Sequence, residues 1–244
     1  MLSIIIPTFQ EEKSIKNTLK VINEGLTKEM FEFEIIVVDD NSNDQTKKII
    51  SNFSKINSNI HFYLNDSSKG FGNSIVKGIE YSKGIYVAIM MADLSDSVDD
   101  LIYYYTTILY NKKLDCVFGD RWSENSVKNY PFFKKVINRT GNIILMKLFK
   151  TNYSDFTNSF KLYKRSALKE ISPIISNHFS ITLELPLKMI ARGYNYKVVS
   201  NKWENREHGV SKMQILNSIV TYSLITVYCL IDKYFWNKRL VIKR

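Results

Sequence analysis

The sequence predicts an α/β fold built on a mostly parallel central sheet flanked by helices, and two observations indicate it. Apolar runs of strand length recur in the first half of the chain, at 2–6, 35–38, 60–64 and 85–92. Unbroken runs of this kind are typical of strands buried on both faces. Segments with helical apolar spacing separate them, and this alternation favours parallel strands joined by crossover helices.

The elements can be placed in order along the chain. The first strand is expected to stop at Pro7, and helical spacing begins at Glu11 and continues through Ile22. After the second strand, residues 41–44 supply a turn and a helix N-cap, and residues 69–72 lead into a third helix. Further along, strands are expected at 115–119, 159–163 and 194–200, and helices at 136–149 and 180–191.

Carboxylates stand where two of the predicted strands end. Asp39 and Asp40 follow the run 35–38, and Asp93 follows the run 85–92. Because the carboxyl ends of parallel strands meet at the edge where open α/β sheets bind ligands, we expect these acids to converge. Carboxylate oxygens suit hard divalent cations and the phosphates that they carry. The sequence therefore indicates a metal–phosphate site, against the alternative that the acids only cap the following helices.

The charge balance favours an anionic partner but does not by itself distinguish one kind of anionic partner from another. The net charge is +10 and the pI is about 9.3, which suits nucleic acid, an anionic membrane surface or a phosphorylated substrate. The lysines are spread along the chain, which argues against a nucleic-acid partner. No dinucleotide-type glycine motif follows the first strand and no Walker A motif occurs. Cys116 and Cys229 lack metal-type spacing and are expected to be reduced core thiols.

The end of the sequence suggests contact with a membrane. Residues 213–231 carry no charge and are about as long as a minimal membrane span. Hydroxyl residues opposite an apolar stripe favour an amphipathic helix lying on a membrane or docked on the protein, with a core helix and a true span as alternatives. Aromatic and cationic residues mix over 122–135, as in an interfacial segment or a loop packed on the body. A basic tail follows the helix, with Lys233, Lys238, Arg239, Lys243 and Arg244.

Several spaced motifs occur together in one order. They are Ser3–Glu11, Glu34–Asp44, Lys69-Gly70, Met91–Ser95, Gly119-Asp120-Arg121, Arg139 with Asn142, Asp155–Lys161, Glu184 and Arg206–Lys212. This set resembles glycosyltransferase family 2 and, within it, the dolichol-phosphate mannose synthase-like group, which transfers sugars to polyprenyl phosphates. The resemblance covers nearly the whole chain up to about residue 212.

For the donor, the resemblance implies a GT-A (Rossmann-like) domain over 1–212, followed by a membrane-associating amphipathic helix and basic tail over 213–244. The domain would bind a GDP- or UDP-sugar, with Mg²⁺ or Mn²⁺ bridging its diphosphate. The metal would be held by Asp93 with help from Ser95. The residues implied for nucleotide-sugar binding are Pro7, Thr8, Glu11, Asp39, Asp40, Lys69, Ala92, Asp93, Arg206 and Lys212.

For catalysis, the resemblance implies Asp93, Arg121, Arg139 and Glu184. Arg121 and Arg139 would bind a lipid-phosphate acceptor, although both could be surface cations. A phosphate acceptor is already an anionic nucleophile that needs no strong base. A sugar hydroxyl would need one, and Glu184 is the candidate unless it only supports the fold.

Two departures from the family pattern affect the expected function. Met91 replaces the first acid of the metal motif, and a thioether is a poor ligand for hard cations. Asn158-Ser159 replaces Ser-Gly near the acceptor. We expect an inverting transferase that moves a sugar from a nucleoside-diphosphate sugar to a polyprenyl phosphate, peripheral on the cytoplasmic face of a membrane, without a nucleic-acid partner. The alternatives are transfer to a glycan hydroxyl and a non-catalytic nucleotide-sugar-binding subunit, which Met91 favours.

Overall fold

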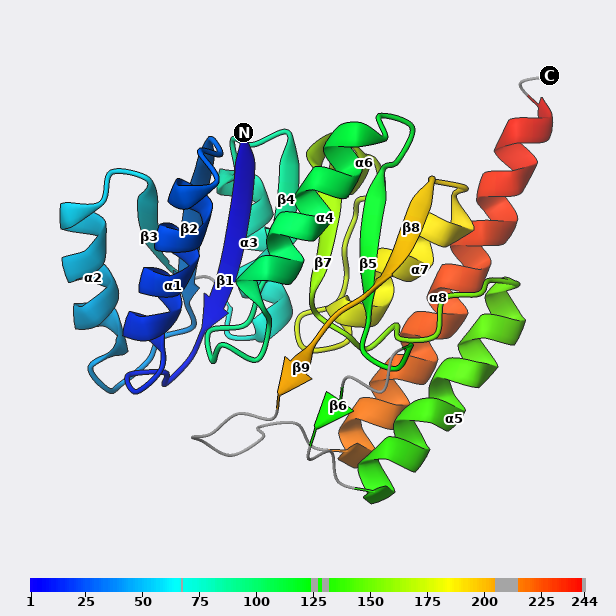
Figure 1. The fold of residues 1–244 in the computed structure, drawn as a ribbon. Helices are drawn as coiled ribbons and strands as arrows, with labels where there is room; N and C mark the ends of the chain where they lie inside the picture. Colours follow the sequence, from blue (N-terminus) through cyan, green and yellow to red (C-terminus); the bar gives the residue numbers. More distant parts are fainter. Residues whose placement is uncertain (67, 124–126, 129–131, 205–214, 243–244) are drawn as a thin grey trace.

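The computed structural model describes residues 1–66, 68–123, 127–128, 132–204 and 215–242, and its centre is a seven-stranded sheet (Figure 1). The strand order is β3–β2–β1–β4–β7–β5–β8. The strands are β1 (Leu2–Thr8), β2 (Phe33–Asp39), β3 (Ile60–Leu64), β4 (Tyr86–Ile89), β5 (Cys116–Asp120), β7 (Lys161–Lys164) and β8 (Tyr196–Ser200). Within this sheet β7 pairs antiparallel with both of its neighbours, and the other pairs are parallel. The predicted mostly parallel sheet is confirmed.

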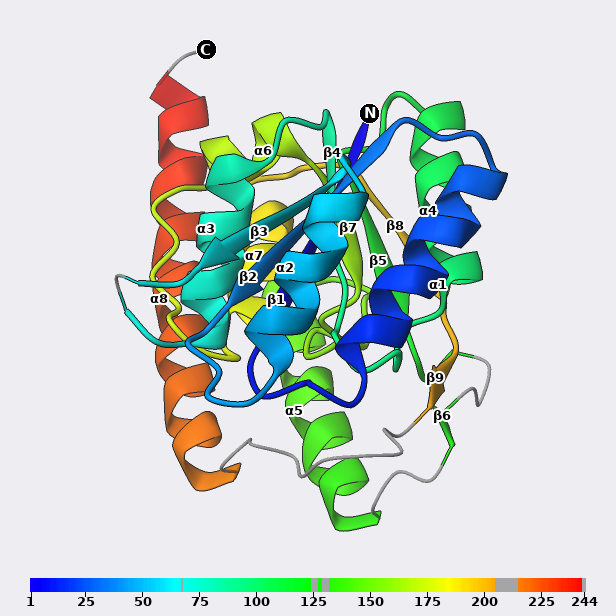
Figure 2. The same ribbon diagram turned by 90° about the vertical axis from the view of Figure 1, so that its left-hand side faces the viewer.

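Helices cover both faces of the sheet (Figure 2). They are α1 (Ile15–Lys28), α2 (Thr46–Ile56), α3 (Phe71–Tyr81), α4 (Val98–Tyr110), α5 (Phe132–Phe149), α6 (Arg165–Glu170), α7 (Ile181–Ala191) and α8 (Ile215–Ile242). Ile4 and Ile6 of β1 pack into one core cluster with α1, α2 and α4, while Ile5 packs into a second cluster with helices that include α3 and α7. The two clusters follow from the alternation of side chains along a strand, which explains why β1 is buried at every position.

The prediction that the first strand stops at Pro7 is wrong, because β1 continues to Thr8. The Ile5 carbonyl accepts a hydrogen bond from the Met90 N–H at 3.0 Å, and the Thr8 carbonyl accepts one from the Asp40 N–H at 2.8 Å. Successive residues therefore face β4 and β2 in turn, and Pro7 faces the β4 side, beyond the end of that strand. A proline is tolerated there because no partner strand requires its missing N–H.

Helix α8 is docked on the body of the protein. The Asp232 carboxylate receives two hydrogen bonds from the Arg192 guanidinium, at 2.8 and 2.9 Å. The Lys188 ammonium lies 4.8 Å from the centre of the Tyr228 ring, and Cys229 is fully buried. The helix extends to Ile242, so part of the expected basic tail is helical, while the boundary expected at 212–213 lies outside the described residues.

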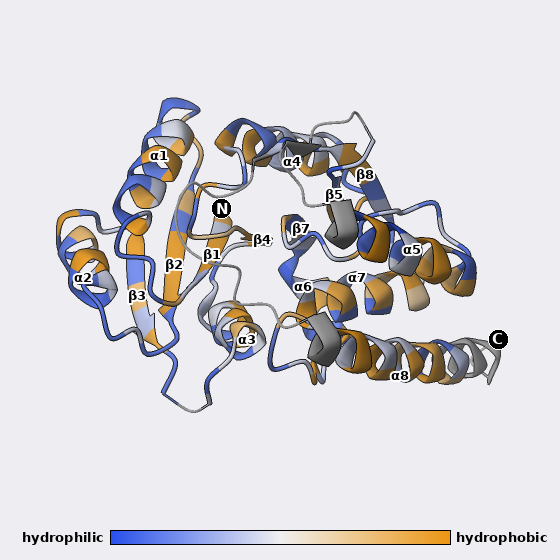
Figure 3. Cartoon of the chain, turned by 90° about the horizontal axis from the view of Figure 1, so that it is seen from below, coloured by the Kyte–Doolittle hydropathy of each residue, from blue (hydrophilic) through white to orange (hydrophobic). Residues whose placement is uncertain are grey.

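The outer side of α8 remains apolar. Val220, Leu224, Val227 and Ile231 are each more than half exposed, and hydrophobic residues also line α5 (Figure 3). The amino-terminal ends of α5 and α8 extend past the sheet at the end where β1 finishes (Figure 1). Of the helices in the described part of the chain, none is both long and apolar enough to cross a bilayer.

Candidate functional site

The end of β2 carries Asp39 and Asp40, and both carboxylates accept hydrogen bonds. Fully buried Asp39 accepts from the Ser42 N–H at 2.8 Å and from its hydroxyl at 2.5 Å. Asp40 accepts from the Gly70 N–H at 2.9 Å and from the Asn65 amide at 2.8 Å. Gly70 has φ +143°, and a Cβ there would clash with backbone, so only glycine can present this N–H. Asp39 thus fixes the loop before α2, and Asp40 fixes the loop before α3.

The other predicted donor residues gather at the same edge. Pro7 and Thr8 end β1, which lies between β2 and β4 in the sheet. Glu11 lies in the loop that leads into α1, and Lys69 is exposed in the loop before α3. The structure therefore brings these side chains to the carboxyl edge of parallel strands, where open α/β sheets bind ligands. Their contact with a nucleotide stays a prediction.

The loop after β4 presents Asp93. Its Oδ1 accepts a hydrogen bond from the Ser95 N–H at 3.1 Å, and Ala92 and Ser95 are buried. Asp96 is also buried, and its Oδ2 accepts the Met91 N–H at 2.9 Å. Burial raises the pKa of Asp96 to about 7. Asp96 therefore shapes the loop from inside, and Asp93 is the half-exposed acid at its tip.

The loop fits a divalent cation that shares its ligands with a phosphorylated substrate. Among the residues that the structure describes, no group of three or more His, Cys, Asp or Glu side chains could hold a metal ion alone. The Met91 thioether does not suit a hard cation. Mg²⁺, however, is commonly held by one or two carboxylates together with substrate phosphates and water. Asp93 together with the diphosphate of a donor would meet that requirement, and metal binding by Asp93 and Ser95 stays a prediction.

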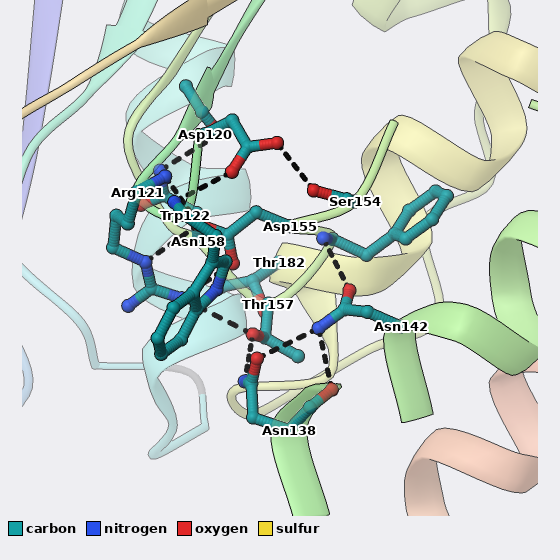
Figure 4. A network of polar contacts seen from close by, with 12 residues as sticks. Asp120, Arg121, Trp122, Asn138, Asn142, Ser154, Asp155, Thr157, Asn158 and Thr182 are labelled. Atoms are coloured by element: carbon teal, nitrogen blue, oxygen red, sulfur yellow. Dashed lines mark hydrogen bonds and ion pairs between the residues drawn. The ribbon is translucent and has the colours of Figure 1, made fainter. Parts of the chain in front are cut away.

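Arg121 follows β5 and is held by a buried carboxylate (Figure 4). Its Nε and Nη2 each donate to Asp155 at 2.8 Å, and its backbone N–H donates to the same carboxylate at 3.0 Å. Burial alone would raise the pKa of Asp155, but the Arg121 guanidinium brings it below its usual value. The guanidinium is consequently oriented before any ligand arrives. Arg121 is buried and is therefore not a surface cation, while its contact with an acceptor phosphate stays a prediction.

The same network ties α5 to the loop before β7 (Figure 4). The Thr157 hydroxyl accepts from the Asn138 amide at 2.6 Å. The Asn142 Oδ1 accepts the Phe156 N–H at 2.8 Å. Sequence reasoning did not single out Asn138, because a polar residue on a helix does not reveal whether it faces solvent or another loop. These bonds set the position of α5 relative to Arg121.

Two cations of α5 gather around Trp122. The Arg139 guanidinium carbon lies 5.5 Å from the Trp122 ring centre, and the Lys135 ammonium lies 5.6 Å from it. Arg139 also donates to the Ser154 carbonyl at 3.3 Å. An aromatic face attracts cations and holds them near one another. The structure thus adds Lys135 and Trp122 to the predicted Arg139 beside the Arg121 network.

Glu184 is fully buried in α7 and its carboxylate has partners within the fold. It accepts the backbone N–H groups of Ile175 at 3.0 Å and Ser176 at 2.8 Å. It also pairs with the Lys188 ammonium at 2.8 Å. A base must reach the proton that it removes, and this carboxylate is enclosed. The contacts favour the interpretation of Glu184 as a fold-supporting carboxylate.

Asn158, one of the two departures in the acceptor motif, is buried and makes hydrogen bonds within the fold. The Asn158 amide donates to the Gly119 carbonyl and to Asn201 Oδ1, both at 3.0 Å. Lys161, at the end of the same motif, donates to the Phe156 carbonyl at 3.0 Å, and burial lowers its pKa to about 7. Nothing in an apolar strand pattern distinguishes such a lysine from an exposed one.

The segment that leads toward Arg206 and Lys212 is described as far as Glu204. There β9 (Trp203–Glu204) pairs in parallel with β6 (Val127–Lys128). Arg206 and Lys212, both implied for nucleotide-sugar binding, lie outside the described residues.

Two relatives of known name align with most of the chain. This chain is 23% identical over 223 residues to the glycosyltransferase AglD of Haloferax volcanii. The alignment covers 89% of this chain and 35% of AglD. This chain is 25% identical over 217 residues to the polyprenol monophosphomannose synthase of Mycolicibacterium smegmatis, covering 86% and 80% of the two chains. The chain thus spans about a third of AglD and most of the mycobacterial enzyme.

Solved structures share the fold at low sequence identity. Glucosyl-3-phosphoglycerate synthase from Mycobacterium tuberculosis, solved with Mn²⁺ and UDP-glucose, has a TM-score of 0.72 at 14% identity, covering 93% of this chain and 78% of that one. Its complex with phosphoglyceric acid has a TM-score of 0.71, covering 96% and 79%. These likenesses support the predicted GT-A fold.

The family assignment rests on a match over most of the sequence. The model of glycosyl transferase family 2 matches residues 3–172, more than half of the chain. The match contains the Asp39–Asp40 edge, the Asp93 loop and the Arg121–Asp155 pair. The predicted family is confirmed: this chain belongs to glycosyl transferase family 2.

Proposed function

We propose that this protein transfers a sugar from a nucleoside-diphosphate sugar to a polyprenyl phosphate, with inversion at the anomeric carbon. The observation that carries the proposal is the gathering of Lys135 and Arg139 around Trp122, beside the prealigned Arg121. Cations placed in this way suit an anionic acceptor. The buried, paired state of Glu184 supports an acceptor that needs no general base. The similarity to a polyprenol monophosphomannose synthase supports the same acceptor class.

The chemistry can be assigned to this chain's own groups. Asp39, Asp40 and the end of β1 would hold the nucleotide, and Asp93 with Ser95 would hold Mg²⁺ or Mn²⁺. The chemistry that such a cation would supply, when bound there, is stabilisation of the charge on the departing diphosphate. Lys135 and Arg139 would hold the acceptor phosphate so that its oxygen forms the new bond to the anomeric carbon. The bond from that carbon to the diphosphate breaks, and its electron pair leaves with the diphosphate.

A small phosphorylated acceptor is the second candidate. The M. tuberculosis structure with phosphoglyceric acid shares this fold, and the same cations would suit such a molecule. The exposed apolar residues of α5 and α8 favour the lipid acceptor instead, because a small soluble acceptor requires no membrane contact.

The function can be tested by donor turnover with purified protein, GDP- and UDP-sugars and Mn²⁺. We expect turnover with a polyprenyl phosphate and none with phosphoglycerate. Arg139→Ala is expected to raise KM for the lipid phosphate about 10- to 100-fold, the value of one charge-assisted hydrogen bond. Lys147→Ala, an exposed lysine on the same helix, is the matched control and should behave as wild type.

Other outcomes of this assay would replace the proposal. Turnover with phosphoglycerate would identify the small acceptor, and turnover with a glycan would identify a hydroxyl acceptor. Donor binding without turnover across the acceptor panel would indicate a non-catalytic subunit.

We also propose that the protein lies on the cytoplasmic face of a membrane, through the outer sides of α5 and α8. The exposed apolar residues and the net charge of +10 support this placement. In flotation with vesicles of phosphatidylglycerol and phosphatidylcholine, we expect the wild-type protein to bind. The double variant Leu224→Asp, Val227→Asp should bind at least ~10-fold more weakly, because burying one such side chain contributes about 1.5–3 kcal/mol.

Ile56 provides the control for membrane binding. It is 82% exposed on α2, and Ile56→Asp should float as the wild type does. Equal binding by the α8 double variant and the wild type would contradict membrane contact through α8.

A further inference from the structure

We infer that Trp203 is a positioning residue that holds the Asp93 loop and Arg121 in register with each other. The inference rests on the proposed function, because it assigns Asp93 to the donor and Arg121 to the acceptor side. Trp203 lies in β9, immediately after β8, and is half-buried. Three separate segments meet at this residue: the loop after β4, the residue that follows β5, and β6.

The loop after β4, on the donor side of the proposed site, contacts Trp203 through the backbone. Trp203 forms an antiparallel bridge with Asp96. Asp96 in turn accepts the Met91 N–H at 2.9 Å, and it closes the turn that presents Asp93. One backbone bridge and one side-chain bond therefore tie the backbone of Trp203 to the metal-binding loop, and neither of them involves the indole ring.

Arg121, on the acceptor side of the proposed site, contacts the indole ring of Trp203. The Arg121 guanidinium carbon lies 5.8 Å from the ring centre, and a planar guanidinium stacks well on an indole face. The guanidinium that stacks on the ring is itself held in place, because Arg121 donates two side-chain hydrogen bonds to buried Asp155. Val127 of β6 pairs with Trp203 as well, so the segment after Arg121 is attached at the same point.

The base of the segment is anchored independently of the ring. The Lys202 N–H donates to the Asp100 carboxylate at 2.8 Å, and the Asn201 N–H donates to the Asp120 carbonyl at 3.2 Å. Substituting the ring of Trp203 should therefore leave the strand in place. What is lost is the stacking contact that links Arg121, itself held by Asp155, to the strand bridged to the Asp93 loop.

The consequence for the reaction is specific. Transfer requires the acceptor oxygen and the anomeric carbon to lie within about 3–3.5 Å of each other, and an error of about 1 Å costs roughly 100-fold in rate. Nucleotide affinity depends on the donor side alone. Loss of the ring should therefore lower kcat and leave the Kd of the nucleotide unchanged, whereas a structural defect would weaken both.

The experiment compares Trp203→Leu with Trp203→Phe, and uses Trp236→Leu as the matched control. Trp236 also stacks on an arginine, with the Arg192 carbon 4.8 Å from its ring centre, but it lies on α8. With a short-chain polyprenyl phosphate in detergent, we expect Trp203→Leu to lower kcat about 100-fold. Trp203→Phe should recover most of the rate, and Trp236→Leu should match the wild type. The Kd of UDP or GDP with Mg²⁺, measured by calorimetry, should be the same in all four proteins.

Two results would overturn the inference: a kcat for Trp203→Leu equal to that of Trp236→Leu, or a nucleotide Kd that rises in parallel with the loss of kcat. A separate readout needs no acceptor. The chain has three tryptophans, so Trp203 is the only one left in Trp122→Phe, Trp236→Phe. Adding UDP or GDP with Mg²⁺ should change its emission. If the wild type lacks turnover, the proposed function fails. An emission change on adding the nucleotide would then still support the link between Trp203 and the Asp93 loop, and an unchanged emission would reject that link.

Discussion

Asp93→Asn is expected to lower donor turnover about 1,000-fold, because Lewis-acid stabilisation of the leaving group contributes several kcal/mol. The substitution keeps the shape of the side chain and its acceptor oxygen for the Ser95 N–H. It removes the negative charge that a hard cation needs. Initial rates measured over a range of Mn²⁺ concentrations would show the loss, with nucleotide binding by calorimetry as the check on folding.

Met91→Asp is the matched gain of function for the same loop. It restores a second carboxylate where the family pattern has one, so the Mn²⁺ concentration for half-maximal rate should fall. A wild-type rate in Asp93→Asn, or an unchanged metal requirement in Met91→Asp, would contradict the assignment of the metal to this loop.

Asp155→Asn is expected to lower the free energy of unfolding by about 3–5 kcal/mol, the usual cost of leaving a buried charge without its partner. The Asp155 carboxylate is fully buried and receives three hydrogen bonds from Arg121. Asparagine offers only one acceptor oxygen and no charge. Urea denaturation, with the midpoint and the slope fitted together, measures the change.

Asp66 supplies the control for that measurement. It also pairs with a cation, Lys77, but its side chain is exposed, so water replaces the interaction and Asp66→Asn should unfold as the wild type does. If Asp155→Asn kept wild-type stability, Arg121 would have to find an equivalent partner, and its prealignment by Asp155 would be disproved.

The apolar runs and helical spacing were sufficient to predict the parallel sheet, because burial on both faces leaves a continuous apolar pattern in each strand. They also placed Asp39, Asp40 and Asp93 at one edge, since strand ends in a parallel sheet share a side. The prediction that the first strand stops at Pro7 failed because it considered the proline alone and not the neighbouring strand. A strand boundary at a proline depends on whether a neighbouring strand needs its N–H, and that neighbour, β4, is distant in sequence.

Local periodicity therefore sufficed for the sheet and for the edge that carries the acids, because each depends on interactions within one element. The family followed from the resemblance of many spaced motifs taken together. The partners of Arg121 and Trp203 did not follow from the sequence. Asp155 is 34 residues from Arg121, and the bridge from Trp203 to Asp96 crosses an even longer stretch of chain. Whether a charged side chain is a ligand, a positioning group or a support depends on such long-range pairing, which arises only when the elements pack together.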